Sequence, residues 1–236
     1  MKRYMRKIRF LLLLLLPLAA SAGNLETTEL IFEEREPVVP EAYLTRMLLT
    51  DDFLRMDDGG DDDDYLLYDR NAGKIYSVNH EDRRVVVVEP AARSIREPEA
   101  YRHETRVIPA ELPAIGGREV LQVQHYTNDV LCFEVYAAEG LLTDAVEALT
   151  GFAQILAYQH AATIADIPAE FQSACDLVNN VYQPARYLSK GFPVRQRDYL
   201  GRSRVLQSFR ENIKKDEQLF VIPDNYHLFY PGKTPI

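Results

Sequence analysis

Short segments of alternating side chains, separated by turn residues, dominate the sequence from residue 25 to about residue 136 and constrain the fold most strongly. A polar turn at residues 50–52 separates two such segments, and a turn at residues 69–73 separates the next two. Residues 85–88 are consecutive valines, whose β-branched side chains fit a pleated sheet. These patterns predict an antiparallel meander in which the valine strand is covered on both faces.

Helical spacing replaces this alternation after residue 141. Apolar side chains recur three and four positions apart, which places them on one face of a helix that Thr143 would cap. That stripe comprises Leu142, Ala145, Val146, Leu149, Phe152, Ala153 and Leu156. Pro168 is expected in the first turn of a second helix, with Phe171, Cys175 and Val178 on one side. For both stripes, core packing is favoured over a cofactor role.

Further strands are expected before and after the two helices in the sequence. Residues 90–118, which are rich in proline, arginine and glutamate, predict a long loop with one short strand near residues 106–108. The remaining predicted strands are residues 119–126, 130–137, 192–199, 203–210 and 219–222, followed by a short carboxyl-terminal tail. The expected fold is α+β, mostly β, with an antiparallel sheet of about ten or eleven strands and two main helices.

The first 22 residues have the three parts of a secretory signal peptide. Basic residues at positions 2, 3, 6, 7 and 9 precede an apolar run at residues 10–20, which is shorter than the about 20 residues a membrane-spanning helix needs. Ala20-Ser21-Ala22 then provides small residues for cleavage. We expect cleavage after Ala22, one domain at residues 23–236, and a periplasmic location in a Gram-negative bacterium. An uncleaved membrane anchor is the alternative, whereas a lipoprotein anchor lacks its cysteine.

Charge excludes one class of partner. Removing residues 1–22 takes away five of the 27 basic residues and none of the 36 acidic ones, which leaves 22 against 36 and a net charge of −14. A general nucleic-acid binder needs a basic face that displaces counterions from phosphates. We therefore expect no nucleic-acid partner.

Cys132 and Cys175 are the only cysteines. In an oxidising compartment a bridge between two well-placed thiols persists, so a disulfide is favoured over two buried free thiols. The chain-entropy model gives such a bridge about 4 kcal/mol of stabilisation, less any strain. Catalytic redox pairs are spaced more closely, which favours a structural role here.

Three segments carry a resemblance to a known family. They are residues 50–57, residues 68–70 together with 74–78, and residues 219–226. These segments are similar to parts of LolA/LolB-like periplasmic domains, which include relatives of unknown function. Departures from the lipoprotein carrier are the cysteine pair, the proline-rich insertion at residues 90–118 and the acidic cluster after Met56.

This resemblance implies a curved antiparallel half-barrel, the LolA-like half-barrel, whose concave face is closed by the two helices. In the carrier family the enclosed apolar cavity holds the acyl chains of lipoproteins. Arg55 matches the strand position of the family's motif arginine. Candidate cavity residues in this chain are Arg55, Tyr68, Tyr76, Leu149, Phe152 and Leu156. Ordinary cross-strand and core packing is the alternative for the aromatic and helical members of this set.

No catalytic constellation is visible, and no cofactor is expected. The five histidines are scattered, without the spacing of a metal-binding helix, and no glycine-rich phosphate loop or serine elbow occurs. Asp61, Asp62, Asp63 and Asp64 form the sharpest acidic cluster and are candidate Ca²⁺ ligands. Their spacing does not match an EF-hand, and a solvated hairpin tip is the favoured alternative.

Three functional hypotheses follow. The first is a non-enzymatic periplasmic carrier that shelters a lipid or a lipoprotein acyl chain between the concave sheet and the helix at residues 142–162. The second is an envelope protein-interaction or scaffold module whose acidic surface meets a basic protein partner and that holds no ligand. The third, a hydrolase with dispersed catalytic residues, ranks last because no sequence feature requires it.

Overall fold

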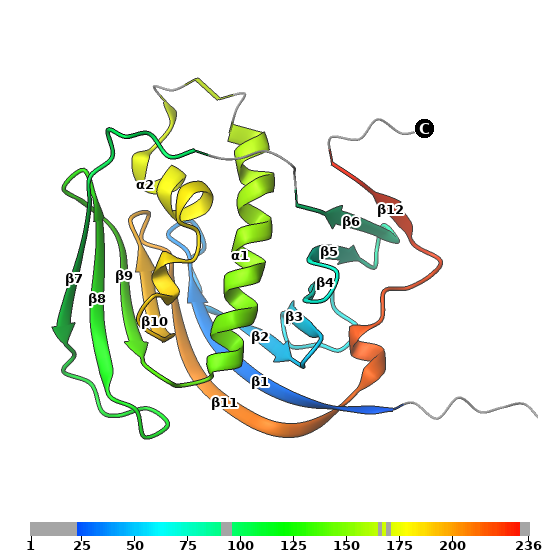
Figure 1. The fold of residues 1–236 in the computed structure, drawn as a ribbon. Coiled ribbons are helices and arrows are strands. Elements are labelled where there is room, and N and C mark those ends of the chain that lie inside the picture. The colour runs from blue at the N-terminus through cyan, green and yellow to red at the C-terminus, as the bar shows by residue number, and fades with distance from the viewer. Residues whose placement is uncertain (1–22, 91–95, 165–166, 169–170, 232–236) are drawn as a thin grey trace, which may run out of the picture.

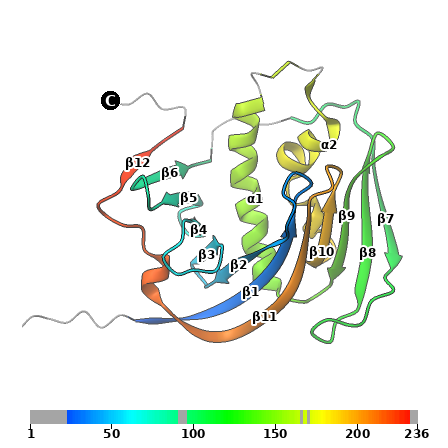
Figure 2. The same cartoon turned by 180° about the vertical axis from the view of Figure 1, so that it is seen from behind.

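The computed structural model describes residues 23–90, 96–164, 167–168 and 171–231. The predicted signal peptide therefore lies outside the described residues. Every strand joins one sheet, in the order β12-β6-β5-β4-β3-β2-β1-β11-β10-β9-β8-β7. The sheet curves around the long helix α1 (Thr143–Ile164), which lies on its concave side (Figures 1 and 2).

Half of the sheet is the predicted meander. Its strands are β1 (Asn24–Arg35), β2 (Tyr43–Leu49), β3 (Phe53–Asp57), β4 (Tyr65–Asp69), β5 (Lys74–Asn79) and β6 (Arg84–Val88). Local chemistry fixes the predicted turns. The Thr50 hydroxyl accepts a hydrogen bond from Phe53 N at 3.0 Å, and Gly73, at a φ of 61°, donates from its N to the carbonyl oxygen of Asp69. Only glycine adopts that φ without strain.

The other half of the sheet is formed by β11 (Ser203–Asp216), β10 (Phe192–Asp198), β9 (Val130–Ala138), β8 (Val120–Thr127) and β7 (His103–Pro109). β1 pairs with both β2 and β11, so the first strand lies inside the sheet rather than at its edge. β7 is longer than the strand predicted near residues 106–108 and forms one edge, with all of its residues exposed.

The first helix is confirmed and the second is much shorter than predicted. α1 begins at Thr143, and its buried residues are Ala145, Ala148, Leu149, Ile155 and Ala157. α2 spans only Ala174–Leu177 and continues as a π-helical turn, η2 (Val178–Tyr182), before the 3₁₀ turn η3 (Arg186–Leu188). Ser173, rather than a residue near Pro168, caps α2, since its hydroxyl accepts from Asp176 N. Phe171 is 76% exposed, so its predicted place in the core is wrong.

The predicted strand at residues 219–222 is also wrong. Glu217–Phe220 forms a 3₁₀ helix, η4, capped by the Asp216 carboxylate, which accepts from Gln218 N at 2.9 Å. The tail then adds a strand that the sequence did not predict, β12 (His227–Phe229), which pairs in parallel with β6. Within the described residues the sheet therefore has twelve strands, antiparallel except for this pair.

Both faces of the meander are covered, the concave face only in part. α1 packs on one face, and the carboxyl-terminal segment at residues 217–230 crosses the other, where Leu219 and Phe220 are buried against Val85 and Val87. Val88 belongs instead to the cluster that contains α1. Burial of this valine strand on both faces explains why its sequence is apolar without alternation, as predicted.

The disulfide is confirmed: Cys132 of β9 is bonded to Cys175 of α2, with a Cα–Cα distance of 5.0 Å. It holds α2 against the sheet beside α1. Among the described residues, no helix combines the length and apolar character that a membrane span requires.

Candidate functional site

α1 covers one row of apolar side chains that crosses the meander. The row consists of Leu49, Leu54, Tyr68, Ile75 and Val88, which are neighbours in register from β2 to β6. All of them are buried in one cluster with Ala148 and Leu149 of α1. This row is ordinary core, and it shows how far the helix reaches across the concave face.

The next row on the same face is mostly apolar but is not covered by the helix. It consists of Met47, Met56, Leu66, Ser77 and Val86, again neighbours in register across five strands. Met47 is buried, whereas the others are only partly buried. Residues two positions apart on a strand face the same side, which is why this row lies beside the covered one. The uncovered row forms the floor of a groove.

A polar rim follows, two positions further along the same strands. It consists of Thr45, Asp58, Asp64, Asn79 and Arg84. The concave face thus changes in three steps, from apolar and covered, to apolar and open, to polar. Such a gradient suits a ligand that has an apolar body and a polar end.

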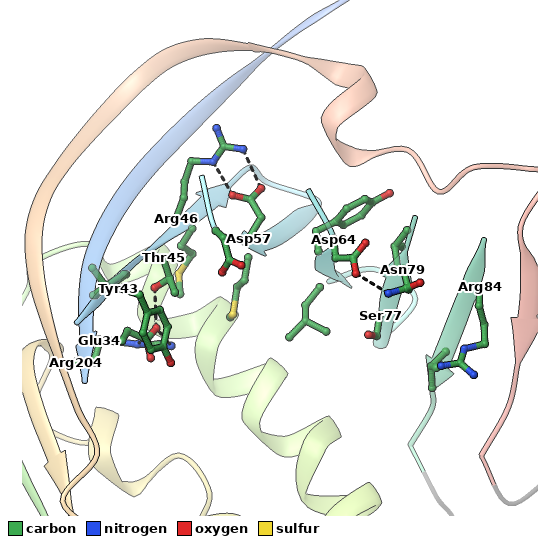
Figure 3. A pocket seen from close by; sticks show the side chains of 18 residues that line it. Glu34, Tyr43, Thr45, Arg46, Asp57, Asp64, Ser77, Asn79, Arg84 and Arg204 are labelled. Carbon is green, nitrogen blue, oxygen red and sulfur yellow. Dashed lines mark hydrogen bonds and ion pairs between the residues drawn. The ribbon is translucent and has the colours of Figure 1, made fainter. Parts of the chain in front are cut away.

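The groove has a volume of about 480 Å³. Strands and their turns line it, and none of the α1 residues 143–164 does. Figure 3 shows Glu34, Tyr43 and Arg204 gathered at one end, with Asn79 and Arg84 toward the other.

Glu34 organises the first end of the groove. Its Oε1 accepts from the Thr45 hydroxyl at 2.7 Å and from Nε and Nη2 of Arg204 at 3.0 and 2.7 Å. The Tyr43 hydroxyl donates to Glu36 at 2.8 Å, and this hydrogen bond to a carboxylate raises the pKa of Tyr43 to about 12. Arg204 and Glu34 therefore neutralise one another, so among the described residues this end offers no free cation.

The second end presents a more exposed cation. The Asp64 carboxylate already has hydrogen-bond donors within the protein, because its oxygens accept from Asn79 Nδ2 at 2.6 Å and from His80 N at 2.7 Å. Arg84 has a side chain that is 54% exposed and reaches Asp82 only at 3.7 Å. Surface ion pairs of this kind are weak, so the Arg84 guanidinium can exchange its partner for an anionic group of a ligand.

A buried charge network lies on the opposite face of the same strands. Asp57 accepts from Nε and Nη2 of Arg46 at 2.8 and 2.9 Å and from Nε of Arg55 at 2.6 Å. The Arg55 guanidinium also lies over the Tyr65 ring, 4.0 Å from its centroid. Burial alone would raise the pKa of Asp57, but the hydrogen bonds from both arginines outweigh it and lower that pKa. The network supports the sheet, and Arg46, Asp57 and Tyr65 of this network also line the groove (Figure 3).

The predicted cavity residues fall into three places. Arg55 and Tyr76 lie on the face that the carboxyl-terminal segment covers, Arg55 in the charge network and Tyr76 against the outer apolar cluster. Tyr68 is buried beneath α1, where its ring meets Phe152 edge-on, and Leu149 is a buried residue of α1 itself. Phe152 and Leu156 line a second, smaller cavity on the other side of the molecule's long helix. None of these six residues lines the groove.

The acidic cluster does not converge on one point. Asp61 pairs with Arg46 at 2.9 Å, Asp63 accepts from Gly60 N, and Asp64 binds Asn79 and His80 as described. Within the described part of the chain, no group of three or more acidic, histidine or cysteine side chains could hold a metal ion. The cluster acts as a turn that supplies Asp61 to the charge network.

The groove floor could not be predicted from the sequence, because the alternation that places Met56 and Leu66 on the concave face also places buried core residues there. The sequence feature that could have indicated them is their position on the strand, between a core residue and a polar residue. Each lies two residues from a buried core residue on its strand, Leu54 and Tyr68 respectively, and two residues from a polar rim residue. Only the placement of α1 decides which of two equivalent rows stays open.

Comparisons with known proteins give no family assignment. No family model matches the chain, and no curated protein does. One similar solved structure is described as an uncharacterized conserved protein from Thermus thermophilus, with 9% identity and a TM-score of 0.41, over 87% of this chain and 90% of that one. A structure of PNGF-II in the C2 space group has the same identity and TM-score, but the match covers only 31% of PNGF-II.

Proposed function

We propose that this protein is a non-enzymatic carrier that binds the acyl chain of a lipid or lipoprotein in the groove of its concave face. The observation that carries the proposal is the uncovered row at Met56, Leu66 and Val86, beside a row that α1 covers completely. Each methylene that leaves water for such a floor contributes about 0.8 kcal/mol. An open apolar row therefore favours an occupant with an apolar chain.

The size and rim of the groove support an amphipathic ligand rather than a purely apolar one. A volume of about 480 Å³ equals that of about sixteen liquid water molecules, enough for an acyl chain of medium length. The apolar chain would lie across β3 to β6, and its anionic end would meet Arg84 at the exposed rim. The paired charges around Glu34 would leave the other end without a free cation.

The same proposal includes a LolA-like half-barrel and a periplasmic location after removal of residues 1–22. The curved sheet with α1 on its concave side supports the first (Figure 1). The Cys132–Cys175 disulfide supports the second, because disulfides persist in oxidising compartments.

Lipid extraction followed by mass spectrometry of protein purified from the periplasm tests this function. We expect co-purifying acyl lipids, and we expect the delipidated protein to bind a fluorescent fatty acid. Leu66→Lys places a charge on the groove floor and should weaken that binding at least about tenfold, since a buried unpaired charge is costly. Val130→Lys, at the first residue of β9 and 54% exposed, is the matched control and should bind normally.

Two results would contradict the proposal. One is protein from the periplasm that carries no lipid and fails to bind the fatty acid after delipidation. The other is a folded Leu66→Lys protein, verified by circular dichroism, that binds the fatty acid as tightly as the wild type.

The free edge of β7 favours a second candidate function, the envelope protein-interaction module. Every residue of this edge strand is exposed, including the apolar Val107 and Ile108 at 44% and 42%. Exposed strand edges pair readily with a strand of another protein. Val107→Lys should abolish capture of a protein partner in a pull-down and leave lipid content unchanged, whereas Leu66→Lys should do the reverse.

A further inference from the structure

A second cavity lies between α1, the strands β9 and β10, and the turn that follows α2. Its volume is about 270 Å³, and it shares no lining residue with the groove. Phe133, Phe152, Leu156 and Tyr187 give it apolar walls, and its polar lining groups are Arg186, Gln196, His160 and two asparagines. The volume equals that of about nine liquid water molecules, which suits a ligand of about eight to ten non-hydrogen atoms, roughly the size of octanoate.

Arg186 brings a positive charge to this cavity without a carboxylate partner. Its Nε and Nη2 donate to Asn179 Oδ1 at 3.0 and 2.6 Å, and its Nη1 donates to the Thr127 hydroxyl at 3.0 Å. Within the described ranges, no carboxylate lies within ion-pair distance of this guanidinium. Burial lowers the pKa of Arg186 to about 10, opposed only by the more distant charge of Glu97.

The surrounding titratable groups do not supply the missing anion. Glu97 is engaged elsewhere, because its oxygens lie 2.6 Å from His103 Nε2 and 3.0 Å from Gln183 Nε2. His125, whose pKa burial lowers to about 4, is neutral near pH 7. A half-buried charge that is hydrogen-bonded only to neutral groups costs free energy, which an anion at this position would recover.

Gln196 adds a second unsatisfied group to the same cavity. Its Oε1 is buried and has no hydrogen-bond partner among the described residues. Buried side-chain polar atoms normally have a partner. A terminal amide can present either its oxygen or its two N–H donors, so Gln196 can donate to a ligand carboxylate beside Arg186.

We propose that this cavity binds a carboxylic acid of about the size of octanoate, whose apolar chain packs among Phe133, Phe152 and Leu156 and whose carboxylate meets Arg186. A guanidinium pairs with a carboxylate through two parallel N–H donors, which a neutral or cationic head group cannot match. The site is independent of the groove and would hold a smaller molecule than a membrane lipid.

Calorimetric titration of the full mature protein with octanoate, octan-1-ol and octylamine tests the site. We expect octanoate to bind at least about tenfold more tightly than octan-1-ol, because a charge-assisted hydrogen bond to Arg186 separates the two. Octylamine should not bind. Arg186→Met should remove the preference for octanoate, whereas Arg197→Met, an exposed arginine next to Gln196 on the same strand, should keep it.

A second variant keeps the test decisive if Arg186→Met does not fold. Leu156→Trp should fill the cavity while leaving Arg186 in place, and it should abolish octanoate binding. Three outcomes would overturn the proposal: wild type that does not bind octanoate, equal binding of octanoate and octan-1-ol, or full binding by folded Arg186→Met or Leu156→Trp protein. Loss of octanoate binding in the groove variant Leu66→Lys would also overturn it, by assigning octanoate to the groove.

Discussion

Nη1 of Arg55 donates a hydrogen bond of 2.6 Å to the carbonyl oxygen of Leu219, so that β3 holds a segment 164 residues later in the chain. Arg55 is 2% exposed, and its Nη2 also donates to the carbonyl oxygen of Asp61. The Tyr65 hydroxyl donates to the carbonyl oxygen of Val221 at 2.8 Å beside it. The motif arginine of the family resemblance therefore anchors the carboxyl-terminal segment to the outer face of the sheet.

Arg55→Lys should release this segment more than it perturbs the rest of the fold. A lysine ammonium cannot reproduce the fork that contacts Asp57, Leu219 and Asp61 together. We expect a loss of about 1–3 kcal/mol in the free energy of unfolding, because buried carbonyl groups lose their donors. Hydrogen exchange at residues 217–230 should accelerate. Arg35→Lys, at an exposed ion pair, should change neither quantity, and unchanged exchange in Arg55→Lys would refute the anchoring role.

Asp57 should make the free energy of unfolding depend on pH in the acidic range. Its pKa is lowered in the folded protein from an ordinary value of 3.8, so the unfolded chain binds its proton first as the pH falls. The stability that Asp57 contributes is complete above about pH 4 and is lost as the pH falls through the lowered pKa. Urea midpoints measured from pH 7 to pH 2 should show this loss in the wild type.

Asp57→Asn should lower stability at neutral pH and flatten this acid dependence. Removing the carboxylate leaves Arg46 and Arg55 buried without their shared anion, which costs about 3–5 kcal/mol. Burial alone would raise the pKa of Glu29, but hydrogen bonds from Lys215 and Arg210 lower it, so Glu29 keeps its own acid dependence in the variant. An Asp57→Asn protein as stable as the wild type at pH 7 would contradict the role assigned to the network.

The sequence predicted those parts of the fold that local chemistry determines. The turn at Asp69 to Gly73 is specified by its own residues, and the apolar spacing that begins near residue 142 is enough to place α1. The position of β1 is different, because its pairing with β11 joins Glu29 to Arg210 across 181 residues. No local signal reports such a contact, and the short tail strand β12 has none either.

The candidate site was harder to predict for the same reason. Two parallel rows of apolar side chains occupy the concave face, and the choice between core and groove depends on where α1 lies. Arg55 was predicted as a cavity residue because it matches the motif arginine of the family resemblance, but strand alternation places it on the opposite face from Leu54. Arg186 carries no sequence signal at all, since only the folded structure shows that it lacks an acidic neighbour.

Gly151 should resist replacement by alanine, although alanine favours helices. A Cβ at this position would lie 2.3 Å from the Tyr68 hydroxyl oxygen and 3.1 Å from Cζ. Elsewhere in a helix interior, Gly→Ala gains about 1 kcal/mol. Here we expect a net loss, partly restored when Tyr68→Phe removes the hydroxyl. Urea unfolding of both single variants and the double variant measures this coupling, and a stabilising Gly151→Ala would exclude the close contact.

Removing the Cys132–Cys175 disulfide should affect the second cavity more than the groove. The bridge fixes α2 against β9, and Asn179 Nδ2 donates to the carbonyl oxygen of Cys132 at 3.1 Å. Asn179 in turn orients Arg186. The double variant Cys132→Ala with Cys175→Ala should lose about 4 kcal/mol in the free energy of unfolding, since the unfolded chain regains the freedom of the closed loop.

In the same disulfide-free variant, octanoate binding should weaken severalfold more than binding of the fluorescent fatty acid, because the groove is lined by residues of β1 to β6 and β11 and does not include α2. Wild-type protein treated with a reductant should behave like the double variant, which controls for the loss of the two sulfur atoms from the core. If the binding of both ligands weakened equally, the bridge would stabilise the whole fold without orienting Arg186. If only octanoate binding weakened, the disulfide would be needed to shape the cavity beside α2.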